Sequence, residues 1–164
     1  MKNFKLFLAF ILITTLSFAQ KSPKQQTTGI IDGVNITIDY SAPSVKGRTI
    51  WGKLEKYNKV WRAGADKNTT ISFDKDVTIN GKDLPAGKYG FFIIPRKNED
   101  WTIIFNTKND NWGAFKYKEK EDALRVNITP VFGEENQEQL FYGVMDTILV
   151  AWEKVSLNIK VAAK

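Results

Sequence analysis

The stretch Leu84-Pro85-Ala86-Gly87-Lys88-Tyr89-Gly90-Phe91-Phe92-Ile93-Ile94-Pro95 describes one complete strand with a turn before it and a stop after it. Leu-Pro-Ala-Gly is typical of a tight turn, and Pro95 ends the strand because it cannot donate a backbone hydrogen bond. Residues 91–94 are all apolar, and the segment Trp101-Thr-Ile-Ile-Phe105 is nearly so. We therefore expect both to be central strands of a sheet that is covered on both faces.

Shorter strand patterns surround this pair. Val34–Tyr40 alternates apolar and polar residues after an Asp32-Gly33 hairpin turn, and Asn80-Gly81 predicts another tight turn. Further strands are expected at 71–73, 77–79, 124–131, 139–145, 148–152 and 155–161. Roughly nine short strands predict an all-β fold, an antiparallel β-sandwich of jelly-roll or immunoglobulin-like type with one long irregular loop. Helical turns are expected only within 51–60 and 116–124.

The first 19 residues have the pattern of a secretory signal peptide. Lys2 and Lys5 precede an apolar run from Leu6 to Leu16, and Ser17-Phe18-Ala19 supplies small residues for cleavage. We expect cleavage after Ala19, a single β-sandwich domain over residues 20–164, and an exported protein that is periplasmic, secreted or on the outer surface. No later run of about 18 apolar residues follows, so no transmembrane segment is expected in the mature chain.

The composition removes several kinds of chemistry. The chain has no Cys and no His, which excludes a Ser-His-Asp triad, a cysteine nucleophile and a zinc site built from imidazole or thiolate. The sequence has no glycine-rich phosphate loop, dinucleotide fingerprint or calcium-loop spacing, so we expect no cofactor and no metal. We assign no catalytic residue.

Positive charge is concentrated in residues 46–67. This stretch has seven Lys and Arg against two acidic residues, a local charge of +5, whereas the whole chain carries +6 with its leader included. A basic segment in an exported protein favours a glycan or an anionic envelope ligand over nucleic acid. The alternative is a solvated, lysine-rich loop.

Aromatic and guanidinium groups are interspersed among these charges. Arginine offers a planar fork to a carboxylate or phosphate, and tryptophan stacks on a sugar face or a cation. The candidate ligand-binding residues are Lys46, Arg48, Trp51, Trp61, Arg62 and Asp66, together with Trp112 from the Asn- and Asp-rich loop 106–112. Alternatively, Arg62 pairs with Asp66 or Glu55, and the two tryptophans of the basic loop plug the open end of the sandwich. In both cases we expect Arg62 to be at least half buried.

These residues also resemble a bacterial family, the domain of unknown function 2911. The matching motifs are Tyr40-Ser41, Pro43 to Arg48, Trp51-Gly52, Val60-Trp61-Arg62, Gly64-Ala65, Thr69-Thr70, Leu84 to Tyr89, Ile94-Pro95, Trp112-Gly113 and Ala151-Trp152-Glu153. The resemblance implies an exported protein of Bacteroidetes-type bacteria, and the function of the family is not known. Two positions differ from its pattern, Ala63 where Thr is usual and Asp66 where Asn is usual.

Three functions agree with the sequence. The favoured one is a non-catalytic binding module that holds a glycan or anionic envelope ligand through the loop 46–70. The second is a structural or protein-partner-binding envelope protein. The third is a carboxylate-dependent hydrolase, in which Asp66 acts with Glu135 or Glu138.

Overall fold

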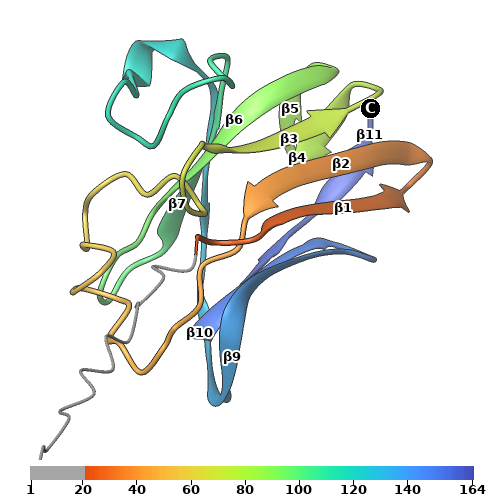
Figure 1. The fold of residues 1–164 in the computed structure, drawn as a ribbon. Coiled ribbons are helices and arrows are strands. Elements are labelled where there is room, and N and C mark those ends of the chain that lie inside the picture. The colour runs from red at the N-terminus through yellow and green to blue at the C-terminus, as the bar shows by residue number, and fades with distance from the viewer. Residues whose placement is uncertain (1–20) are drawn as a thin grey trace, which may run out of the picture.

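The computed structural model describes residues 21–164, and the predicted leader lies outside this range. The described chain is an antiparallel β-sandwich (Figure 1). Its strands are β1 (Lys24–Ile31), β2 (Val34–Ser41), β3 (Thr69–Phe73), β4 (Val77–Ile79), β5 (Lys82–Leu84), β6 (Gly87–Ile94), β7 (Trp101–Asn106), β8 (Asp122–Ile128), β9 (Val131–Val144), β10 (Ile148–Ile159) and β11 (Val161–Ala163). A short 3-10 helix, η1 (Glu119–Glu121), precedes β8. Within this range, no helix is long and apolar enough to cross a membrane.

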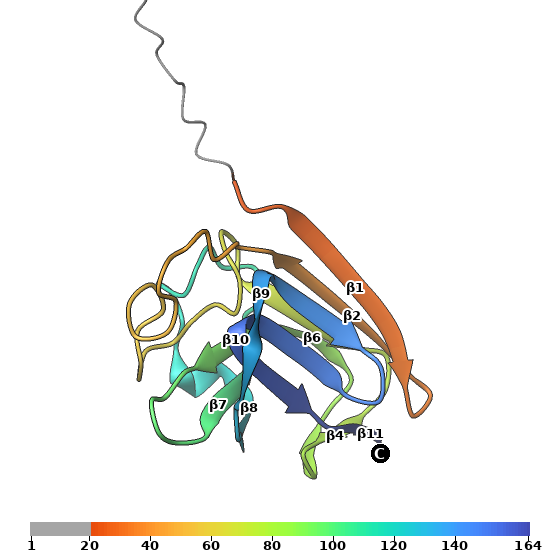
Figure 2. The same cartoon turned by 90° about the horizontal axis from the view of Figure 1, so that it is seen from below.

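The strands form two layers (Figure 2). One layer is a six-stranded sheet in the order β1-β2-β3-β6-β7-β8, and the other contains the β9–β10 hairpin and the small sheet β11-β4-β5. Alternate residues of β2, such as Ile36 and Ile38, point into the space between the layers and are almost fully buried. Burial of these apolar side chains, rather than disulfide bonds, holds the layers together.

The expectation of central strands covered on both faces is confirmed. β6 lies between β3 and β7, and its inward side chains join the main core. Its outward residues Phe92 and Ile94 pack with Ile104 of β7 in a second apolar cluster. Val60 and the loop residues Ala114 and Tyr117 are packed against that cluster.

The strand count differs from the expected nine, because the described chain has eleven. β1, β5 and β11 are additional strands, while the two expected at 148–152 and 155–161 are one strand, β10. Glu153 has a left-handed backbone (φ 55°) and lies at a shift in the register with β9. The Trp-Glu-Lys sequence therefore makes a bulge within one strand rather than a break between two.

The expectation of a helical turn within 51–60 is wrong. Gly52 and Asn58 both have positive φ angles, 82° and 60°, which interrupt a right-handed helix. The segment instead folds into a tight turn in which the Leu54 and Glu55 amides donate to the carbonyls of Thr49 and Ile50. The second expectation is confirmed, since η1 falls within 116–124.

Four indole rings meet where the loop 42–68 packs against the sandwich; we call them the tryptophan cluster. Trp51 and Trp61 come from the loop, Trp101 begins β7, and Trp152 lies in β10. The Trp51 ring centroid is 4.6 to 5.7 Å from those of the other three. Trp61 stacks on Trp152 at 5.5 Å. The cluster thus joins the loop to both layers.

We expect Trp61→Ala to lower the free energy of unfolding by about 3 to 5 kcal/mol, since it removes a buried indole from this cluster. Trp112→Ala is the matched control, because that ring is 56% exposed, and its effect should stay within about 0.5 kcal/mol. Urea unfolding of the two variants checks this. Equal losses of stability would contradict the structural role of Trp61.

Candidate functional site

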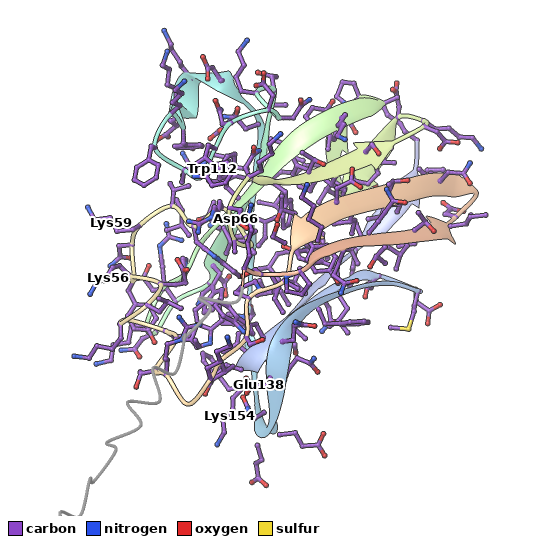
Figure 3. All side chains as sticks on the ribbon, viewed as in Figure 1. Lys56, Lys59, Asp66, Trp112, Glu138 and Lys154 are labelled. Atoms are coloured by element: carbon purple, nitrogen blue, oxygen red, sulfur yellow. The ribbon has the colours of Figure 1, made fainter. Side chains whose placement is uncertain are left out.

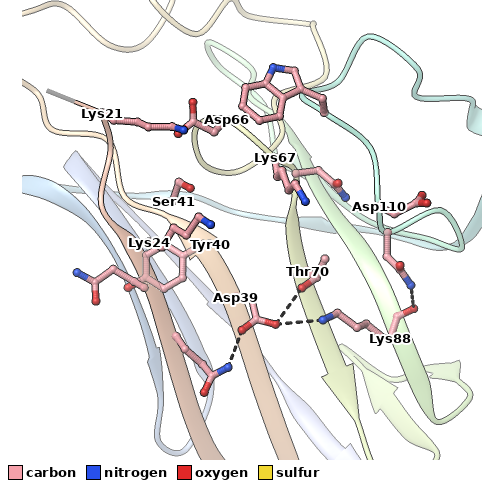
Figure 4. A pocket seen from close by; sticks show the side chains of 15 residues that line it. Lys21, Lys24, Asp39, Tyr40, Ser41, Asp66, Lys67, Thr70, Lys88 and Asp110 are labelled. Carbon is pink, nitrogen blue, oxygen red and sulfur yellow. Dashed lines mark hydrogen bonds and ion pairs between the residues drawn. The ribbon is translucent and has the colours of Figure 1, made fainter. Parts of the chain in front are cut away.

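A groove of about 820 Å³ lies on the outer face of the six-stranded sheet; we call it the polar groove. Fifteen residues line it: Lys21, Lys24, Gln25, Gln26, Asp39, Tyr40, Ser41, Asp66, Lys67, Asn68, Thr70, Lys88, Asn109, Asp110 and Trp112. The alternation of β2 places it there: while Ile36 and Ile38 enter the core, Asp39 points outward. Figure 4 shows the side chains around the groove.

Asp39 is the centre of the groove floor. Its Oδ1 accepts a hydrogen bond from Gln26 Nε2 at 2.6 Å, and its Oδ2 accepts from Lys88 Nζ at 3.1 Å and from Thr70 Oγ1 at 3.4 Å. The hydrogen bond from Gln26 is the largest cause of a lowered pKa for Asp39, and Lys88 adds to it. The three partners come from β1, β3 and β6, so with Asp39 of β2 they form a polar row across four neighbouring strands.

One wall of the groove consists of two loops joined by their backbones. Lys67 and Trp112 form an isolated β-bridge. The Asn68 amide donates to the Asn111 carbonyl at 3.1 Å, and the Gly113 amide donates to the Asp66 carbonyl at 2.9 Å. Trp112 is therefore exposed but held in place.

Glycine allows this wall to approach the sheet. A Cβ on Gly90 would lie 2.3 Å from the Lys108 carbonyl oxygen and 2.7 Å from Asn68 Nδ2. Asn109 also reaches over β6 and donates from its Nδ2 to the Lys88 carbonyl at 2.8 Å. The bare backbone at position 90 thus lets the loop after β7 lie directly on β6.

The structure separates the residues proposed from the sequence. Asp66 and Trp112 line the polar groove, whereas Lys46, Arg48, Trp51, Trp61 and Arg62 do not. Arg48 donates from its side chain to the carbonyls of Ser44 and Val45, and the Lys46 amide donates to Glu138. Trp51 and Trp61 belong to the tryptophan cluster.

The two departures from the family pattern also lie in different places. Ala63 is fully buried, and its carbonyl accepts hydrogen bonds from Thr69 Oγ1 at 2.8 Å and Tyr142 Oη at 2.7 Å. Asp66 lines the groove and has a left-handed backbone (φ 59°), which Asp and Asn tolerate. Of the two, only Asp66 is placed to affect a ligand in the groove.

Arg62 is more than half buried, as expected, but within residues 21–164 it makes no ion pair with Glu55 or Asp66. Its Nε is buried without a hydrogen-bond partner in the same range. Burial raises the pKa of the nearby Glu55 carboxyl from 4.5 to about 7, although Arg62 and Arg48 act in the opposite direction.

The sequence reasoning missed most of the polar groove. Alternation in β2 already assigned Asp39 to a polar face, but nothing local indicated that Gln26, Thr70 and Lys88 would surround it. The proposed acidic partners Glu135 and Glu138 lie on β9 and do not line the groove with Asp66. Figure 3 shows Asp66 and Glu138 on separate parts of the molecule.

The described residues offer no obvious metal site. Within residues 21–164, no group of three or more His, Cys, Asp or Glu side chains is placed to hold a metal ion. What the polar groove presents instead is an exposed indole beside carboxylate, amide, hydroxyl and ammonium groups.

Comparison with known proteins gave one family. The model described as "Protein of unknown function (DUF2911)" matches residues 22–161. No curated protein and no solved structure matched the chain. The matched range includes every strand that contributes to the polar groove.

We expect Gly90→Ala to destabilise the protein by about 1 to 3 kcal/mol, because the new methyl group must displace the loop backbone at Lys108. Gly133→Ala is the control, since a Cβ there meets nothing within 4 Å. Chemical unfolding checks both variants. Equal stability of the two would contradict the close packing of this loop on β6.

Glu55 makes stability depend on pH. Burial raises the pKa of the Glu55 carboxyl in the folded state, so folding favours its neutral form. The stability linked to that neutral form is fully present below about pH 4.5 and is lost as the pH rises through about 7. We expect Glu55→Gln to show a smaller fall in melting temperature than the unmodified protein over this range, with the difference reaching several degrees at pH 8. Thermal scans from pH 4 to 8 test this, and parallel curves would contradict it.

Proposed function

This chain belongs to the DUF2911 family of proteins of unknown function, and we propose that it is an exported, non-catalytic module that binds envelope carbohydrate in the polar groove. The ligand would lie on the outer face of β1, β2 and β3, between the chain around Lys24 and the loop at Trp112. Only the end of the loop 46–70 lines this groove, through Asp66, Lys67, Asn68 and Thr70. The other lining residues come from other parts of the chain.

The observation that carries the proposal is the exposed indole of Trp112 on a backbone that is paired with a neighbouring loop. This side chain is 56% exposed and, unlike the more exposed Phe115, it lines the polar groove. Its backbone is paired to Lys67, so the ring stands on a supported wall and not at a loose tip. An indole face held at the edge of a groove supplies a surface on which an apolar sugar face can stack.

The other groove side chains suit the hydroxyl groups of a sugar. Asp66 and Asp110 offer carboxylate acceptors, while Asn109 and Gln25 carry amides that both donate and accept. The volume of about 820 Å³ falls within the range of small-molecule sites, and the floor is formed by paired strands. A short oligosaccharide would therefore meet a rigid surface with many directional hydrogen-bonding groups.

The two roles considered for the long loop apply to different parts of it. Up to Trp61, the loop packs its tryptophans into the core and serves as an anchor. From Asp66 onward it lines the groove. The anchor supports the binding proposal because it fixes the start of the segment that carries Asp66 and Lys67.

We expect purified protein, residues 20–164, to bind a subset of oligosaccharides on a glycan array that includes bacterial envelope glycans, and Trp112→Ala to weaken that binding at least tenfold. The loss follows from removal of the stacking surface. Phe115→Ala is the matched control: this ring is 90% exposed on the same loop and does not line the groove.

Two results would contradict this function. One is the absence of binding to any glycan by folded protein. The other is an equal loss of binding in Trp112→Ala and Phe115→Ala, which would separate the ligand from the groove. Circular dichroism of each variant establishes that it is folded before the array is read.

A further inference from the structure

We propose that the polar groove contains an oxyanion subsite formed by Lys24, Ser41 and Lys67, and that it selects carbohydrates carrying a carboxylate or phosphate group. This inference rests on the proposed carbohydrate-binding function and names the chemical class of the ligand. It is carried by the distribution of charge in the groove and by the hydroxyl group of Ser41, a mostly buried residue that lines the groove.

The positive charges of the groove exceed what its carboxylates neutralise. The groove contains four lysines, at positions 21, 24, 67 and 88, and three aspartates, at positions 39, 66 and 110. Only one pair among them lies within ion-pair distance, Lys88 with Asp39 at 3.1 Å. Lys24 and Lys67 therefore remain available to a ligand anion.

The carboxylate of Asp39 is already occupied. Gln26 donates a hydrogen bond to one of its oxygens, and Lys88 and Thr70 both donate to the other. The remaining two aspartates, Asp66 and Asp110, belong to the opposite wall. Lys21 extends from the β1 side toward Asp66 (Figure 4). The β1 side of the groove, residues 21–26, carries two lysines and no acidic residue. A ligand anion would meet little repulsion there.

Ser41 supplies a neutral donor on the floor between the lysines. The residue is 7% exposed, yet it lines the groove, and Figure 4 shows no hydrogen bond from its hydroxyl to another groove residue. Its position is fixed on both sides: Lys24 is its register partner in β1, and its carbonyl accepts from the Ala65 amide at 3.1 Å. A hydroxyl group on a fixed backbone, in a groove also lined by two lysines that form no ion pair within residues 21–164, is suited to an oxyanion.

The geometry also assigns different parts of the ligand to different parts of the groove. Lys67 is next in sequence to Asp66 and pairs through its backbone with Trp112, so the ammonium group and the indole share one wall. A sugar ring over Trp112 would therefore place a charged substituent toward Lys67, Ser41 and Lys24. Stacking would supply affinity for the ring, and the subsite would supply preference for the charged form.

The test uses oligosaccharides in matched pairs that differ only in charge. One arm compares oligogalacturonate with its methyl ester, and the other compares a phosphorylated oligosaccharide with the same sugar after phosphatase treatment. Both arms are drawn from glycans that the array detects. We expect the protein to bind the charged member of at least one pair about tenfold more tightly, which is the effect of one good charged hydrogen bond.

The variants then assign this preference to the subsite. We expect Lys24→Met with Lys67→Met to abolish the preference for the charged member, measured as the ratio of the affinities for the two members of a pair. Ser41→Ala should reduce the preference about threefold, since it removes one neutral hydrogen bond. Lys56→Met with Lys59→Met is the control double variant, because both lysines are exposed on the loop 42–68 and neither lines the groove (Figure 3).

The outcomes separate the two proposals. Equal affinity for both members in both arms would overturn the oxyanion subsite and leave the carbohydrate-binding function intact. A loss of preference in the Lys56 and Lys59 control equal to that in the groove variant would also overturn it, because general surface charge would then explain the preference. No binding to any glycan would overturn both. Preference in one arm only identifies the carboxylate or the phosphate as the anion.

Discussion

The tryptophan cluster is the interaction on which the rest of the architecture near the groove depends. The loop between β2 and β3 has no regular secondary structure, so its path is set by what it buries. The Trp61 ring packs in the cluster. Its backbone pairs with Ile93 of β6: the Trp61 amide donates to the Ile93 carbonyl at 2.8 Å, and the Ile93 amide donates to the Trp61 carbonyl at 2.9 Å. Its indole Nε1 also donates to the Gly64 carbonyl at 3.2 Å. One residue therefore joins the core, strand β6 and the segment that leads to the groove.

From that anchor the chain has little freedom. Gly64 packs so closely that a Cβ there would lie 2.7 Å from Thr69 Oγ1, and the next amide, that of Ala65, donates to Ser41. These contacts deliver Asp66 and Lys67 to the rim beside the strand that carries Asp39. The residues that pack into the core and those that line the groove thus follow one another in one short segment. A change in the core packing therefore affects the shape of the groove.

Local patterns predicted much of the fold because they report local geometry. Asp32 and Gly33 both have positive φ angles, as the hairpin turn requires, and the apolar run in β6 is covered on both faces. The candidate site was harder to predict because exposure depends on distant partners. Trp61 and Trp112 are similar signals in sequence, yet one stacks on Trp152 of β10 and the other faces solvent. Positive φ at Gly52, which ruled out the helical turn, likewise could not be read from the spacing of apolar residues.

The backbone pairing of residues 66–68 with 111–113 has a consequence for the way in which a ligand would arrive. Because that wall is built from main-chain hydrogen bonds, its outline exists before binding. No loop has to close or become ordered, so the entropy lost on binding would come mainly from the lysine side chains. Free and bound backbones should then be nearly superimposable, and association would be limited by encounter and not by rearrangement.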